Sequence, residues 1–254
     1  MINKKTLRLA GLVIVLFLAI VVLFNKTAMG QKEKLAAYRL FNRLTYRVDT
    51  SLSLLTASKE SITQLDIPLH YQEHSLSCEV AALKMALNYL GVTITESELI
   101  KNLPFDNTGN LSSNNIWGDP EKGFVGSIDG KMPKSGYGVY ETPIANLASK
   151  YRKALPLEKA NLTEILQAVF EKKAVIVWGY TGSGVPITWK TDDGREIKAV
   201  FGEHVRVISG FSGTVANPSN IWLLDPIYGK IRMSKDQFLK NWATLDNRAV
   251  IVYQ

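Results

Sequence analysis

The sequence predicts an α+β domain that follows an apolar N-terminal helix. Three observations support this. Apolar residues recur at helical spacing as far as about Lys172, they alternate from Ala174 onward, and the early stretch Leu9–Phe24 carries no charge. Helices first and strands second are typical of α+β folds, whereas βαβ units would alternate the two. Hydrophobic residues form 46% of the 254-residue chain, which excludes a wholly disordered protein.

Residues 1–30 have the layout of a membrane-inserting segment. The run Leu9–Phe24 has sixteen residues, and as a helix it would span roughly 24 Å of a ~30 Å hydrocarbon core. Basic residues precede it, as in a signal anchor, yet Ala28-Met29-Gly30 could serve as a signal-peptide cleavage site. Both interpretations stay open. We expect location at the cell membrane through this helix, with an extracytoplasmic domain.

The charge distribution argues against a nucleic-acid partner. The chain carries +7, but residues 1–48 hold nine basic side chains and one acid, so the remainder is close to neutral at −1. Basic residues that flank an apolar run favour membrane anchoring over a nucleic-acid face.

Residues 31–64 read as an amphipathic stalk and a linker before a globular domain at 65–254. Within Gln31–Val48, the residues Ala37, Leu40, Phe41 and Leu44 fall at helical spacing. A stalk that separates the domain from the bilayer is one interpretation, and a helix that binds a specific partner is the other.

The globular part begins with an extended segment, Leu65–Tyr71, and a helix from Cys78 to about Leu90, which Gly91 ends. Thr95 caps a short second helix that runs to Lys101. The long polar loop Pro104–Tyr140 is expected to be functional or a lid. Further helices are expected over Pro143–Lys150, Leu162–Lys172 and Ser234–Trp242, and strands over Val175–Tyr180, Ile187–Lys190, Glu196–Phe201, Val205–Phe211, Ile221–Leu224 and Ala249–Tyr253.

Four residues could form a cysteine-based catalytic site. Cys78, the only cysteine, begins a helix, where the dipole favours a thiolate. His204 opens one strand and Asp225 closes the next, so antiparallel pairing would bring them to one edge of a sheet. Gln72 offers an amide donor six residues before Cys78. His74 is a rival base with no acid evidently placed to orient it, and His70 is expected to be structural.

This order of residues resembles the C39-like branch of the papain-like cysteine peptidases. The stretches that carry the resemblance are Leu65-Asp66-Ile67-Pro68, Gln72, Cys78-Glu79-Val80-Ala81-Ala82-Leu83, Gly136-Tyr137-Gly138-Val139-Tyr140, Glu203-His204-Val205 and Leu224-Asp225-Pro226-Ile227-Tyr228-Gly229. The resemblance implies a papain-like fold and a peptide or protein substrate. It also implies that Cys78 is the nucleophile, His204 the general base, Asp225 the group that orients His204, and Gln72 part of the oxyanion hole. No cofactor is expected, and the spacing of histidines and cysteine indicates no metal site.

Glu79 departs from the pattern, because better-studied relatives have Gly after the cysteine. A carboxylate beside the thiol disfavours the thiolate. Adjacent helical side chains point about 100° apart, however, so we expect a modest effect. Glu79, Trp117, Tyr137 and Tyr140 are candidate substrate-binding residues, with loop packing as the equal alternative for the aromatic residues. The predicted function is a cysteine peptidase. The alternative is a catalytically silent papain-like module that binds a peptide or a partner at the membrane surface.

Overall fold

The computed structural model describes residues 30, 33–42, 44, 61–109 and 115–254. Apart from Gly30, the predicted membrane-inserting segment 1–30 lies outside the described residues, as do residues 45–60 of the stalk and linker. Among the helices that are described, none combines the length and the apolar character needed to cross a bilayer. The predicted amphipathic helix is helical at residues 33–42 and 44.

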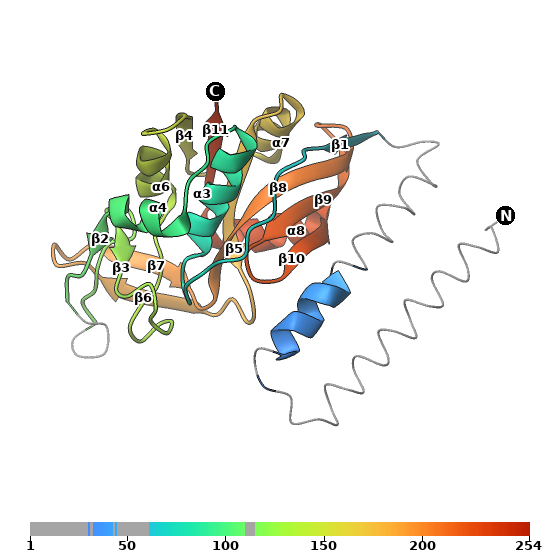
Figure 1. The fold of residues 1–254 in the computed structure, drawn as a ribbon. Helices are drawn as coiled ribbons and strands as arrows, with labels where there is room; N and C mark the ends of the chain where they lie inside the picture. Colours follow the sequence, from blue (N-terminus) through green and yellow to red (C-terminus); the bar gives the residue numbers. More distant parts are fainter. Residues whose placement is uncertain (1–29, 31–32, 43, 45–60, 110–114) are drawn as a thin grey trace.

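A seven-stranded sheet forms the centre of the described domain (Figure 1). All of its pairings are antiparallel. In sheet order its strands are β10 (Gly229–Ser234), β9 (Pro218–Asp225), β8 (Glu203–Gly213), β5 (Ala174–Tyr180), β11 (Ala249–Tyr253) and β4 (Lys153–Leu157), with β1 (Ile62–Gln64) paired to the C-terminal end of β8. The central strands β5 and β8 are buried almost throughout, which explains their nearly continuous apolar sequence.

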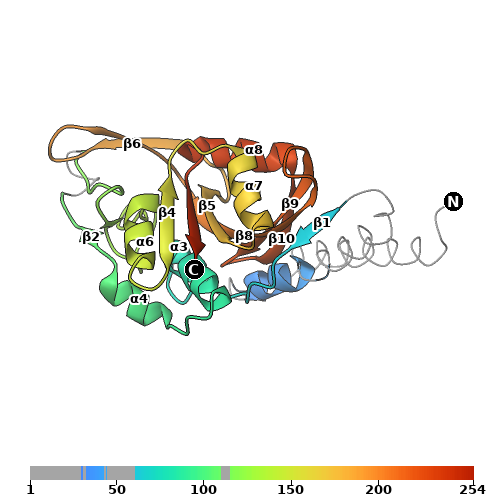
Figure 2. The same cartoon turned by 90° about the horizontal axis from the view of Figure 1, so that it is seen from above.

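Helices cover both faces of this sheet. Helix α3 (Cys78–Tyr89) packs on β8 and β5, with α4 (Glu96–Asn102) and α6 (Glu141–Ala148) nearby. Helices α7 (Leu162–Phe170) and α8 (Lys235–Trp242) contact the same sheet, and Figure 2 shows them on the side opposite α3. Helix α3, the first helix of the domain, therefore begins with Cys78 and packs against β8.

The loop Pro104–Tyr140 is more structured than its composition suggests. It contains a short parallel pair, β2 (Phe105–Asp106) and β3 (Phe124–Val125). Trp117 from this loop is buried against Trp189 of the hairpin formed by β6 (Pro186–Lys190) and β7 (Glu196–Val200). The loop and the hairpin thus form a packed side lobe.

The predicted helices are confirmed to within two residues at most ends, as are the strands from Ala174 onward. The first strand is displaced: β1 ends at Gln64, before the predicted segment Leu65–Tyr71. Besides β2 and β3 inside the predicted loop, two strands of the central sheet were not predicted, β4 and β10, and each lies at an edge of that sheet. Edge strands bury less side-chain surface and tolerate residues such as Pro156, so their sequences carry a weaker strand signal.

Candidate active site

Cys78 is the first residue of α3 and is buried. The preceding residue, Ser77, does not cap the helix with its side chain: its hydroxyl donates to a carboxylate oxygen of Glu96 and accepts the N–H of His74 at 3.1 Å. The first-turn N–H groups of α3 are thus left without a Ser77 side-chain acceptor. Such N–H groups carry the positive end of the helix dipole, which favours negative charge at this position.

His204 and Asp225 meet at one edge of the sheet, as antiparallel pairing predicts. Strands β8 and β9 pair with Val207 opposite Leu224, and this register places the two ends together. The Nε2 atom of His204 lies 2.9 Å from Oδ1 of Asp225. Asp225 therefore fixes one ring nitrogen, and Nδ1 is the nitrogen left for proton exchange.

Asp225 is held by more groups than the sequence indicates. Arg206 donates from Nε to Oδ2 at 2.7 Å, and the backbone N–H groups of Ile227 and Tyr228 donate to Oδ1 at 2.8 and 2.9 Å. Burial alone would raise the pKa of Asp225, but His204 and Arg206 outweigh it and hold that pKa below its ordinary value. Burial lowers the pKa of His204, and the attraction of Asp225 only partly offsets this. A carboxylate beside a neutral imidazole is the state favoured at neutral pH.

Arg206 was missed from the sequence, although a signal for it exists. It lies two residues after His204, and alternate residues of a strand share a face. A charged residue inside the apolar strand Val205–Phe211 requires a buried partner, and Asp225 is that partner.

The thiol of Cys78 lies in an acidic environment. Its Sγ donates to Oε2 of Glu79 at 3.3 Å, and Oε1 of Glu79 accepts the N–H of Val139 at 2.7 Å. Glu203, also buried, belongs to the same cluster, in which the three potential ligand atoms lie within 4.8 Å of one another. The 100° between adjacent helical side chains does not keep Glu79 apart from the thiol, because its side chain is drawn into the interior beside Sγ.

These contacts suppress ionisation of all three acidic groups. Burial raises the pKa of Cys78 well above its usual range, and the nearby carboxyls of Glu79 and Glu203 raise it further. Burial raises the pKa of Glu79 to about 7. Burial and the proximity of Glu79 raise the pKa of Glu203 strongly, and its Oε1 has no hydrogen-bond partner in the described structure. Cys78 is therefore held as a thiol rather than a thiolate.

A cavity of about 130 Å³ joins the two sets of groups. Its lining residues are Gln72, Ser75, Leu76, Cys78, Met132, Tyr137, Thr181, Phe201, Gly202, Glu203, His204 and Ile227. The structure thus brings the predicted nucleophile, base and amide donor to one cavity, with Asp225 behind His204. Within the described residues, the side-chain hydrogen-bond partner of Sγ is Glu79 rather than His204.

Comparison with known proteins agrees with this arrangement. The model of the Peptidase_C39 like family matches residues 64–250. This chain belongs to the C39-like peptidase family. The uncharacterized protein YvpB of Bacillus subtilis (strain 168) is 30% identical over 200 residues, which cover 74% of this chain and 72% of YvpB.

Two solved structures are also similar to this C39-like chain. A Bacillus anthracis protein classed as a C39-like peptidase is 24% identical and has a TM-score of 0.65, with 76% of this chain and 98% of that one covered. The double-glycine motif protease of an AMS/PCAT transporter, solved with its leader peptide, is more distant. It is 14% identical with a TM-score of 0.42, and the match covers 74% of this chain and 92% of that one.

Gln72 lines the cavity of this C39-like domain but is not poised as a donor. Its Nε2 donates to the carbonyls of His74 and Ser75 at 2.8 and 3.0 Å. Both hydrogens of the amide have acceptors, while Oε1 is buried without a partner among the described residues. To donate to a substrate, the side chain would have to exchange one of these carbonyls for the new acceptor.

The candidate substrate-binding residues lie in different places. Tyr137 lines the cavity, whereas Glu79, Trp117 and Tyr140 do not. Tyr140 is buried, and its ring faces the guanidinium of Arg248 at 4.1 Å. For Trp117 and Tyr140 the positions correspond to the loop-packing alternative.

The other two histidines lie outside the cavity. Contrary to expectation, His74 does have an acid partner, since its Nδ1 lies 2.9 Å from Oδ1 of Asp129, but that pair is on the surface. His70 contacts Glu96 at 2.8 Å.

Two groups in the described residues combine side chains that can ligate metals. One is His70 with Glu73 and Glu96, and the other is Cys78 with Glu79 and Glu203. Sequence spacing did not reveal either, because carboxylates from distant segments complete both. In the first group Lys84 Nζ lies 3.3 Å from His70 Nε2 and from Glu73 Oε1, so a cation already occupies that position.

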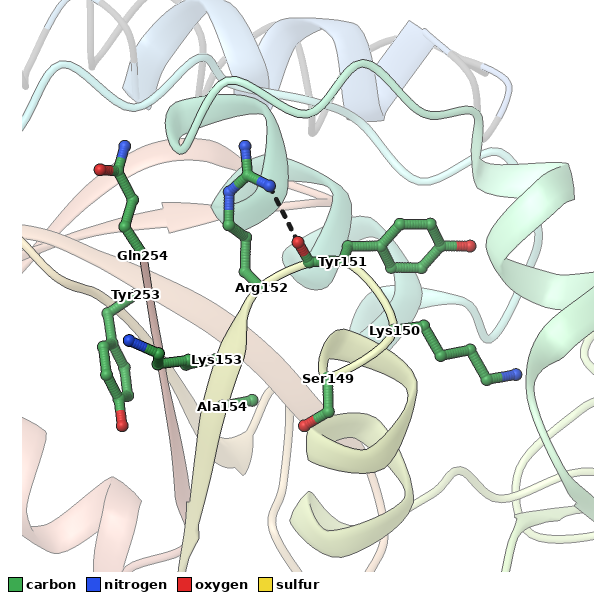
Figure 3. A pocket seen from close by; sticks show the side chains of 8 residues that line it. All are labelled: Ser149, Lys150, Tyr151, Arg152, Lys153, Ala154, Tyr253 and Gln254. Atoms are coloured by element: carbon green, nitrogen blue, oxygen red, sulfur yellow. Dashed lines mark hydrogen bonds between the residues drawn. The ribbon is translucent and has the colours of Figure 1, made fainter.

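A larger surface hollow lies elsewhere, next to the carboxyl terminus (Figure 3). It measures about 880 Å³ and is lined by residues 149–154 with Tyr253 and Gln254. The guanidinium of Arg152 in this hollow donates hydrogen bonds to the backbone carbonyls of Leu90 and Tyr151. None of the residues predicted to be catalytic lines it.

Proposed function

We propose that this chain is a cysteine peptidase that hydrolyses peptide bonds through Cys78, His204 and Asp225. One observation carries the proposal: Cys78 and His204 line the same cavity, while Asp225 holds Nε2 of His204 at 2.9 Å. A thiol at a helix N-terminus, an imidazole and an orienting carboxylate are the components of cysteine-based acyl transfer.

In the proposed reaction His204 takes the thiol proton on Nδ1 as Sγ of Cys78 attacks the carbonyl carbon of the scissile bond. The Cys78 N–H and Gln72 Nε2 stabilise the oxyanion. Collapse of the tetrahedral intermediate breaks the C–N bond, and the imidazolium gives its proton to the leaving amine. Water then attacks the thioester, His204 accepts a proton from it and returns that proton to sulfur. A carboxylic acid leaves, and the thiol is restored.

The electrostatics favour proton transfer during the attack rather than before it. Burial and the two glutamates keep Cys78 protonated, and burial keeps His204 neutral. Asp225, with its lowered pKa, then stabilises the imidazolium that forms as the thiol loses its proton.

A second candidate is a silent papain-like module that binds a peptide or a partner. Two observations favour it: the raised pKa of Cys78, and the donation of Gln72 Nε2 to two carbonyls of its own loop. Such a module would retain the cavity and bind a peptide there, but it would not hydrolyse the peptide.

The test compares the wild type with Cys78→Ala and His204→Gln on a combinatorial peptide library, with cleavage read by mass spectrometry. We expect each variant to lose roughly three orders of magnitude in turnover, because members of a catalytic unit fail together. His74→Ala, at the surface, is the matched histidine control and should retain activity. Turnover by a folded Cys78→Ala protein would contradict the proposal. A wild type that neither cleaves the library nor reacts with iodoacetamide in a His204-dependent way would favour the silent module.

A further inference from the structure

The helix at residues 33–42 contacts the turn that follows Asp225. Arg39 donates from Nε to the carbonyl oxygen of Ile227 at 2.9 Å, and Asn42 donates from Nδ2 to that of Tyr228, also at 2.9 Å. The helix therefore binds consecutive carbonyls of one turn, and Figure 1 shows it beside the end of the sheet that carries β10.

Aromatic contacts extend this interface to the segment that precedes Cys78. The guanidinium of Arg39 lies 3.8 Å from the ring centroid of Tyr71, close enough for a cation–π interaction. The ring of Tyr38 packs edge-on against Tyr228 with centroids 5.9 Å apart. Since the N–H of Gln72 donates to Pro226 at 3.0 Å, Arg39 spans two segments that are already joined beside the cavity.

The inner side of the same turn holds the candidate catalytic carboxylate. The N–H groups of Ile227 and Tyr228 donate to Oδ1 of Asp225, and Ile227 also lines the cavity. The carbonyl of Ile227 and the N–H of Tyr228 belong to one planar trans peptide unit, so they point in opposite directions and rotate together. When Arg39 fixes this carbonyl on the outside, it also fixes the N–H that holds Asp225 on the inside.

We infer that helix 33–42 is a positioning element of the active site, in which Arg39 and Asn42 hold the turn that orients Asp225 and, through it, His204. The inference rests on the proposed function. The residues that the family model matches begin at 64, so the helix lies before the region that this chain shares with that model. The segment interpreted from sequence as a stalk would then contribute to the reaction itself.

The experiment uses the full chain with Arg39→Ala, Asn42→Ala and the control Lys34→Ala. Lys34 lies on the same helix, is exposed, and makes no side-chain hydrogen bond or ion pair with the described residues. We expect Arg39→Ala and Asn42→Ala each to lower kcat about three- to tenfold, because each removes one hydrogen bond that orients the turn. We expect little change in KM. Arg39→Lys keeps the charge but loses the Nε donor, and should fall between the wild type and Arg39→Ala.

A second readout is the pH profile of iodoacetamide reaction at Cys78, which requires no peptidase activity. Looser support of Asp225 weakens its hold on the His204 imidazolium, so we expect slower alkylation at neutral pH and a shifted inflection in Arg39→Ala and Asn42→Ala. Profiles identical to that of Lys34→Ala would overturn the inference. A lower unfolding temperature with an unchanged profile would also overturn it, since that pattern describes a purely structural contact. A wild type that cleaves no peptide would refute the proposed function, while the alkylation profiles would still decide the role of the helix.

Discussion

The two sides of the cavity differ in how their charges are balanced. On one side, which we call the paired side, the Asp225 carboxylate lies between the His204 imidazole and the Arg206 guanidinium, joined to them by hydrogen bonds of 2.9 and 2.7 Å. On the other, which we call the acidic side, Cys78, Glu79 and Glu203 are three buried acids within 4.8 Å. The difference shows that hydrogen bonds fix His204, Asp225 and Arg206 in place, and that the Cys78 thiol is held in its protonated form.

One strand supplies groups to both sides. Side chains on a strand alternate between its two faces, so Glu203 and His204 begin on opposite faces while Arg206 returns to that of His204. The boundary between the paired and acidic sides therefore falls between two adjacent residues of β8. Single substitutions can alter one side and leave the other intact.

The largest effect is expected when the paired side is broken. Arg206→Met removes the cation that faces Asp225 and leaves a buried carboxylate without it, which typically costs about 3–5 kcal/mol. Asp225 has a lowered pKa, so its contribution to stability is present above the unfolded pKa and is lost as pH falls through the folded one. The deficit of Arg206→Met, measured by urea unfolding, should therefore be greatest at neutral pH and shrink in acid.

Lys198→Met, on an exposed position of β7, is the matched control and should be nearly neutral. An Arg206→Met protein that is as stable as this control at pH 7 would show that the fold tolerates the buried Asp225 carboxylate without Arg206.

A somewhat smaller effect on stability is expected on the acidic side. There the contribution to stability is lost as pH rises, whereas that of Asp225 is lost as pH falls. Glu79 has a pKa raised from 4.5 to about 7, so the folded state binds the proton more tightly than the unfolded state. Stability from this group is full below pH 4.5 and is lost as pH rises to about 7, a change of about 3 kcal/mol. Glu79→Gln should remove this loss, so it should be more stable than the wild type at pH 8 and should alkylate faster at Cys78.

Two controls accompany this measurement by urea unfolding. Glu98→Gln on the exposed face of α4 should leave the pH dependence unchanged. Glu203→Gln removes the other carboxyl of the cluster and should act in the same direction as Glu79→Gln. If Glu79→Gln is less stable than the wild type at pH 8, its bond to the Val139 N–H outweighs the relief of buried charge.

The smallest effect concerns Gln72, because its amide is not preorganised for an oxyanion. A preformed oxyanion donor is typically worth about 10²–10³-fold in kcat. Since Nε2 must first give up a carbonyl of its own loop, we expect Gln72→Ala to lower kcat only about tenfold. Steady-state kinetics beside Gln167→Ala, an exposed control on α7, would measure this. A loss of 10³-fold would show that the donor is in place when substrate is bound.

Prediction from sequence worked best where the signal is local. The start of α3 at Cys78 and the strands of His204 and Asp225 are each set by a change of period or by a turn residue within a few positions. It was least successful for Glu79, where the direction of a helical side chain was judged from geometry alone. The helix places its Cβ, but the interior around Val139 and Sγ determined where its carboxyl lies.

The sequence by itself determined the fold class, the order of the candidate catalytic residues and the approach of His204 to Asp225. Antiparallel pairing of successive strands is enough to bring a strand start beside a strand end. Only the tertiary structure decided that Arg206 pairs with Asp225, that Glu79 and Glu203 lie beside the thiol, and that helix 33–42 contacts the turn behind Asp225. Each of these contacts joins segments far apart in the chain or depends on which atoms lose water, and neither property is encoded in a local pattern.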